Sequence, residues 1–176
     1  ADERPKLDVW NWKDSRLQPQ QLKELERDKK RTFLAVYYCE TKKFIQLEDL
    51  NIRNISTIQK GNGDVGLGSD GNPYQRASSW TGKRNGDYYL IDFKSGIKRE
   101  MVKNKSYVRL SPRGNYIIWY EPLDSSYYAK STDINKLDIV PLTKKLPVSF
   151  YDELNDMPMD PRPHGVAGWS EDDRFV

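Results

Sequence analysis

The sequence predicts a mainly β fold: a partial, WD40-like β-propeller of about three adjacent four-stranded antiparallel blades, some incomplete, with one N-terminal helix. Two observations lead to this prediction. Short segments rich in β-branched and aromatic residues alternate with turn signals along most of the 176 residues. A turn motif also occurs twice, with Ser111 and Ser170 at equivalent positions 59 residues apart, which is one blade of ~40–50 residues plus an insertion. Four strands per unit, repeated side by side, are typical of a propeller.

The first copy of the turn motif lies in residues 108–120 and predicts two strands joined by a tight turn. Pro112 presets φ at the first central turn position, and Gly114 tolerates the positive φ that follows. The second copy occupies residues 167–176, and we expect its charged turn, Glu171-Asp172-Asp173, to be exposed. The residues expected to be largely buried are Leu34, Val36, Leu90, Ile117, Trp119 and Trp169.

Composition excludes several classes of protein. The 29 basic and 26 acidic residues are mixed along the chain, so neither nucleic acid nor another polyanion is implied as a partner. No apolar stretch is long enough to cross a membrane. An aromatic content of 12% argues against disorder and suits short strands with one wet face. A single cysteine, Cys39, excludes an internal disulfide framework, and its apolar surroundings predict a buried side chain.

The order of elements follows from changes in periodicity along the chain. Residues 1–31 predict an opening strand, over 7–12, and a helix with an apolar stripe too narrow for a core position. The helix signals are a cap at Asp14 or Ser15, Pro19 in the first turn, and the stripe residues Leu22 and Leu25. The chain begins at Ala1 and stops at Val176 within a predicted strand, so we expect a fragment of a longer protein.

Three β units follow. The predicted division is a partial blade at 32–53, blades at 54–103 and 104–145, and a Pro-rich linker with the start of a further blade at 146–176. The predicted strands are 33–38 and 43–47; 55–59, 64–68, 87–93 and 97–102; and 107–110, 116–120, 127–131 and 137–140.

Three motifs contain residues that could bind a ligand or a metal ion, but their sequence context favours structural roles. Gly61 to Gly66 matches the G-x-G-x-x-G pattern, yet the following residues predict a flexible loop where a phosphate-binding helix would have to begin. Oxygen ligands at Asn62, Asp64, Asp70 and Asn72 fit no EF-hand spacing. His164, beside Gly165, is expected to be structural. We therefore expect no catalytic, cofactor-binding or metal-binding residue and no cofactor.

Several segments resemble the N-terminal β-propeller region of bacterial prolyl oligopeptidase family serine peptidases, relatives of dipeptidyl peptidase IV. The resemblance rests on residues 147–154 and 163–173, of which Gly168-Trp169 is the most specific part, with support from residues 8–22 and 87–92. It implies a non-catalytic propeller that covers the active site of a C-terminal α/β-hydrolase domain and restricts peptide substrates. It also implies a periplasmic or secreted protein whose partners are that hydrolase domain and peptides.

The catalytic elbow of that family has no counterpart here. Gly168-Trp169-Ser170-Glu171-Asp172 begins like a Gly-x-Ser-x-Gly elbow but lacks the second glycine and precedes a strand signal where a helix is needed. We expect Ser170 to be a turn residue and the chain to lack peptidase activity. Asp152 and Glu153 do not align with the family's paired glutamates, so that role is not transferred. The alternative is a stand-alone propeller-type module that binds proteins or glycans through its loops. In either case, uncovered blade edges leave room for oligomerisation.

Overall fold

The computed structural model describes residues 7–136, 138–154, 156–157 and 159–176. Within them the chain is mainly β, with three antiparallel sheets that follow one another in sequence order. The elements are α1 Gln18–Lys29, β1 Ala35–Tyr38, β2 Lys43–Gln46, β3 Asn54–Thr57, the 3-10 turn Gln59–Gly61, β4 Val65–Asp70, α2 Asn72–Thr81, β5 Gly86–Asp92, β6 Lys98–Lys105, β7 Arg109–Leu110, β8 Tyr116–Glu121, β9 Ser126–Ser131 and β10 Ile139–Pro141. No closed sheet occurs in this described part of the chain.

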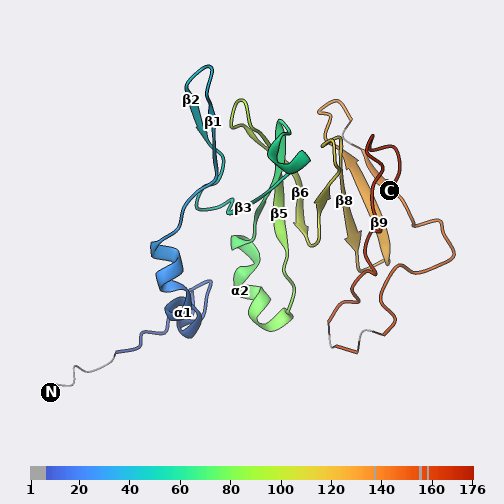
Figure 1. The fold of residues 1–176 in the computed structure, drawn as a ribbon. Helices are drawn as coiled ribbons and strands as arrows, with labels where there is room; N and C mark the ends of the chain where they lie inside the picture. Colours follow the sequence, from blue (N-terminus) through green and yellow to red (C-terminus); the bar gives the residue numbers. More distant parts are fainter. Residues whose placement is uncertain (1–6, 137, 155, 158) are drawn as a thin grey trace.

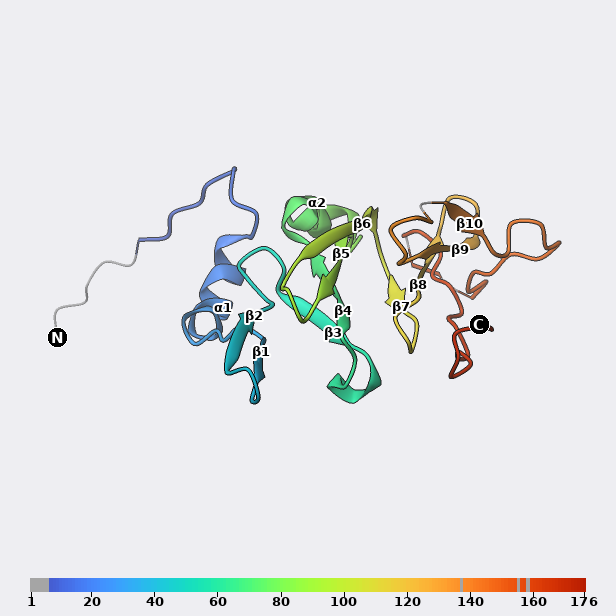
Figure 2. The same ribbon diagram turned by 90° about the horizontal axis from the view of Figure 1, so that it is seen from above.

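Each sheet connects strands that are neighbours in the sequence. The first is the β1–β2 hairpin, the second has the order β3-β4-β5-β6, and the third the order β7-β8-β9-β10. Seen from above, the three sheets form a row in chain order, with α1 at one side and the C-terminal segment at the other (Figure 2). The predicted strands of the three units therefore form, with ends shifted by one to three residues; Leu137, in the last predicted strand, lies outside the described residues.

Apolar side chains fill the space between successive sheets. Ile45 of β2 and Leu47, just after that strand, pack with Ile91 of β5 and with Phe93, just after it. A second cluster joins the second and third sheets, and its buried members are Leu67, Met101, Val102, Val108, Ile117 and Trp119. The three sheets are thus layers of one body, held by burial of apolar surface.

Strand β8 contributes to two apolar layers at once. Ile117 and Trp119 face the second sheet, whereas Ile118 and Tyr120 face the C-terminal segment, where Phe150, Val166 and Trp169 pack. Side chains alternate between the faces of a strand, so four consecutive apolar residues are buried here. The sequence predicts strands with one solvent-exposed face. That expectation is wrong for β8, because the C-terminal segment covers the face that would otherwise be exposed to solvent.

The two copies of the turn motif have the same hydrogen bonds. In the first, the Ser111 N–H donates to the Tyr116 carbonyl, and the Tyr116 N–H donates to the Ser111 hydroxyl. In the second, Ser170 and Phe175 repeat both bonds at 3.0 Å and 2.9 Å. The two turns also dock together, because the buried Asp173 of the second accepts hydrogen bonds from the first. Asp173 was expected to be exposed; it is 5% exposed because its carboxylate fills the first turn.

Helix α2 was not predicted from the sequence. Its boundary signals are present: Pro73 lies in the first turn, where its missing N–H costs nothing, and Gly82 ends the helix in the left-handed region at φ 68°. The helix lies beside β5, below the second sheet in Figure 1. The Gly-rich segment before it is therefore a turn leading into strand β4, not a flexible loop.

Other expectations failed near the N-terminus. Residues 7–12 form no strand, and their side chains are exposed because no neighbouring strand pairs with them. Helix α1 forms as predicted with Pro19 in its first turn, but its N-cap is Leu17 rather than Asp14 or Ser15, with no capping side chain. Leu34 is 38% exposed, and the Cys39 side chain is exposed in the turn between β1 and β2.

Candidate functional site

A groove of about 870 Å³ lies between the residues that precede α1 and helix α2. Loop 82–85 and residues Asn51, Arg53 and Asn54 complete its walls. Three tryptophans line the groove, and Trp10, Trp12 and Trp80 are 63%, 73% and 69% exposed.

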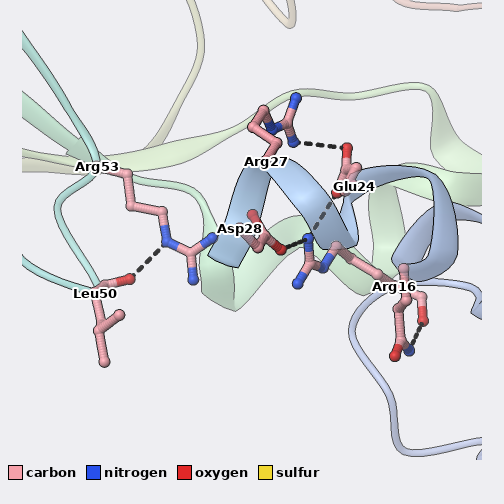
Figure 3. A network of polar contacts seen from close by, with 7 residues as sticks. Arg16, Glu24, Arg27, Asp28, Leu50 and Arg53 are labelled. Carbon is pink, nitrogen blue, oxygen red and sulfur yellow. Dashed lines mark hydrogen bonds and ion pairs between the residues drawn. The ribbon is translucent and has the colours of Figure 1, made fainter. Parts of the chain in front are cut away.

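An ion-pair network fixes the chain where it enters α1 (Figure 3). The Arg16 guanidinium donates to Glu24 at 2.6 Å and to Asp28 at 2.7 Å, and Arg27 also pairs with Glu24. The hydrogen bonds from Arg16 lower the pKa of both carboxyls, and the same bonds raise the pKa of Arg16. Because Arg16 lines the groove, this network holds one wall in place, although partly exposed pairs of this kind stabilise only modestly.

The opposite wall is fixed by Tyr74 of helix α2. Its hydroxyl donates to Asp87 Oδ1 at 2.6 Å, and the backbone N–H of Asn104 donates to the same oxygen at 3.0 Å. Burial, with the Asp87 carboxylate next in importance, raises the pKa of Tyr74 to about 12. Asp87 is 8% exposed, so these two donors compensate the burial of its charge and anchor α2 to the second sheet.

The groove offers flat aromatic faces and polar planar groups. The Arg76 guanidinium lies 5.3 Å from the centre of the Trp12 ring, a cation–π contact across the groove. Asn51, Asn72 and Gln75 add amide donors and acceptors to the lining. Such a surface can stack on a planar or aliphatic ligand face and form hydrogen bonds at its rim, which is binding chemistry rather than catalysis.

Ser170 lies far from this groove, in the second turn motif. Its hydroxyl accepts from the Phe175 N–H and donates to Asp172 Oδ1 at 2.7 Å. Its prediction as a turn residue is confirmed. His164 lies on the C-terminal segment and lines a different, smaller hollow; no hydrogen bond joins it to Ser170 within the described ranges.

The residues considered as cation ligands do not come together. Asp64 precedes β4 and pairs with Lys94 at 2.6 Å, whereas Asp70 ends β4 and accepts from the Asn72 N–H. A six-residue strand separates them by roughly 20 Å. Across the part of the chain that the structure describes, no cluster of three or more His, Cys, Asp or Glu side chains could hold a metal ion.

Sequence reasoning missed the groove because two of its parts were misassigned. Trp80 belongs to the unpredicted helix α2, and Trp10 and Trp12 were placed on a strand. One signal was available: in Trp10-Asn11-Trp12-Lys13 two tryptophans alternate with polar residues in a segment too short to form a strand without a partner.

Comparison with known proteins adds no relative: no family model, curated protein or solved structure matches the chain. Within the described residues, neither helix has the length and apolar character needed to cross a membrane.

Proposed function

We propose that this chain is the non-catalytic β-propeller part of a prolyl oligopeptidase family serine peptidase, periplasmic or secreted, in which it covers the active site and restricts peptide substrates. Its partners are then a C-terminal α/β-hydrolase domain and the peptides that pass to it. The chain itself contributes binding and exclusion, and the hydrolase domain contributes the chemistry.

The docked turn motifs carry this proposal. The same turn occurs twice with the same hydrogen bonds, and the second copy seals the first through Asp173. Layered four-stranded antiparallel meanders, joined in sequence order and linked by such a repeat, are the arrangement that a propeller needs. The family resemblance of residues 163–173 includes this second turn, so the feature that suggests the architecture also suggests the family.

The proposal is tested first by the reading frame beyond Val176. It requires a Gly-x-Ser-x-Gly elbow followed by Asp and His. The complete gene product should then cleave aminoacyl-proline or alanyl chromogenic peptides, whereas the chain of residues 1–176 should not. Hydrolysis by residues 1–176 that disappears in Ser170→Ala would refute the non-catalytic role. A frame without a hydrolase domain would refute the peptidase assignment.

The groove favours a second candidate, a stand-alone module that binds proteins or glycans. Exposed tryptophans beside amide side chains are suited to stacking on sugar faces or on peptide side chains. Saturable quenching of tryptophan fluorescence by an oligosaccharide, lost in Trp12→Ala and Trp80→Ala, together with a frame that lacks a hydrolase, would establish this candidate instead.

A further inference from the structure

A small hollow of about 250 Å³ lies between the outer face of the third sheet and the C-terminal segment. Arg109 of β7, Ile118 and Tyr120 of β8, and Tyr127 of β9 form one side. Residues 162–166 form the other, where Val166 packs on the apolar cluster of this face. The hollow is separate from the groove beside α2, with which it shares no lining residue.

The charges that line this hollow are all of one sign. Arg109 and Arg162 are exposed, and neither forms an ion pair with any residue that the structure describes. The two acidic residues that line the adjoining hollow are paired, Asp160 with Lys83 and Glu121 with Lys105. No aspartate or glutamate lines the hollow. Two unpaired guanidinium groups in a concave surface concentrate a positive potential there.

A buried hydroxyl at the wall of the hollow has no partner. Tyr127 is 8% exposed, and among the described residues its hydroxyl forms no hydrogen bond. Burial raises the pKa of this hydroxyl. The Gly165 backbone and the Arg109 charge act in the opposite direction and lower the pKa, but neither forms a hydrogen bond of normal geometry with the hydroxyl. Both neighbours line the hollow, so the hydroxyl lies at its wall. An unpaired buried hydroxyl is desolvated without compensation, and a ligand acceptor would supply the missing hydrogen bond.

We propose that this hollow binds the side-chain carboxylate of an acidic residue, held between Arg109 and Arg162, with the Tyr127 hydroxyl donating to it once the exposed Gly165 segment shifts. Guanidinium forks match the two oxygens of a carboxylate. Ile118, Pro163 and Val166 supply apolar walls for the methylene stem that carries it. Phosphate shares the charge but lacks such a stem. The site concerns residues 1–176 alone and does not depend on a hydrolase domain.

The test measures binding to the complete chain by calorimetry and by shifts of backbone amide resonances. The probe is acetyl-glutamyl amide, whose only charge is the side-chain carboxylate; acetyl-glutaminyl amide is its neutral isostere, and inorganic phosphate is the competing anion. We expect saturable binding of the glutamyl probe, with shifts at Tyr127 and Gly165. We expect the glutaminyl isostere and phosphate to bind at least about tenfold more weakly.

Matched variants locate the site. Arg109→Gln and Arg162→Gln should each weaken binding by about tenfold or more, whereas Arg84→Gln, an exposed arginine on a neighbouring hollow, should change it less than about twofold. Tyr127→Phe should weaken binding without lowering the melting temperature, because it removes a hydroxyl that has no partner in the free protein. No saturable binding of the glutamyl probe, equal binding of the isostere, tighter binding of phosphate, or equal effects of Arg84→Gln and Arg109→Gln would overturn the proposal.

Discussion

The Ser111 hydroxyl donates a 2.6 Å hydrogen bond to the carboxylate of Asp173, 62 residues later in the chain, and so joins the two turns. The backbone N–H groups of Arg113 and Asn115 donate to the same carboxylate at 3.0 Å and 3.3 Å. The Arg113 side chain meanwhile donates to the Glu171 carbonyl at 2.8 Å. The second turn therefore completes the hydrogen bonding of the first, and the C-terminal segment is held to the third sheet at this point.

The first prediction follows from this contact. Asp173→Ala should lower the free energy of unfolding by about 1–3 kcal/mol, because it leaves the buried Ser111 hydroxyl without an acceptor and two N–H groups without theirs. Urea denaturation followed by tryptophan fluorescence measures the change. Glu171→Ala is the matched control: its side chain is exposed and only its carbonyl is used, so the expected change is within about 0.5 kcal/mol. Equal effects of the two substitutions would contradict the docking role of Asp173.

The second prediction concerns the apolar layer between the second and third sheets. Trp119 is 2% exposed and stacks on Tyr128, its cross-strand partner, with ring centres 5.9 Å apart. Trp119→Ala should cost about 3–5 kcal/mol, because a large cavity opens between two sheets. Thermal and urea unfolding measure the loss. Trp80→Ala, at a site 69% exposed, should leave stability within about 0.5 kcal/mol; wild-type-like stability of Trp119→Ala would refute this packing.

The strands could be predicted from the sequence because their signals are local. Alternation of β-branched and aromatic residues, interrupted by turn residues, is a property of a few neighbouring positions, and the turn at Ser111 combines several such signals. The predicted repeat of that turn at Ser170 forms, with the same two hydrogen bonds as the first copy. Local patterns therefore sufficed for most of the second and third sheets.

Burial could not be predicted to the same extent, because it depends on which segments pack together. Ile118 and Tyr120 are buried by a C-terminal segment that follows about thirty residues later, and Asp173 is buried only by docking on a distant turn. The candidate groove was missed for the same reason: it joins residues before α1 to a helix more than fifty residues away. The boundary signals of α2, Pro73 and Gly82, were present but were outweighed by the glycines that precede it.

The third prediction concerns one of those glycines. A Cβ at Gly68 of β4 would lie 2.5 Å from Ile52 Cγ2 and 2.7 Å from Ile91 Cδ1, both in the layer between the first two sheets. Gly68→Ala should therefore destabilise by about 1–3 kcal/mol through overpacking. Gly168→Ala is the control, since its Cβ would meet nothing within 4 Å and its φ is not positive; we expect no loss of stability. Urea midpoints compare the two, and a neutral Gly68→Ala would show that this layer is not tightly packed.

The fourth prediction is a loss of stability at alkaline pH that depends on Tyr74. Its pKa is raised to about 12, mainly by burial and then by the hydrogen bond to Asp87, whereas in the unfolded chain it titrates near 10. Because its pKa is raised, Tyr74 stays protonated to a higher pH in the folded state than in the unfolded chain. The stabilising contribution is therefore complete below pH 10, and it is lost as the pH rises from about 10 to about 12.

Tyr74→Phe isolates this contribution from that of the other tyrosines. At neutral pH the variant should be less stable than wild type by about 1–3 kcal/mol, because the buried Asp87 loses its hydroxyl donor and keeps only the Asn104 N–H. The difference between the two proteins should then shrink as the pH rises from about 10 to about 12, measured by urea denaturation at each pH. Tyr37→Phe, at a site 56% exposed, is the control and should lower stability at neutral pH by less than Tyr74→Phe does. If the stability difference between wild type and Tyr74→Phe stayed constant across this pH range, the hydrogen bond from the Tyr74 hydroxyl to Asp87 would not contribute to stability. Another contact would then anchor α2 beside the groove.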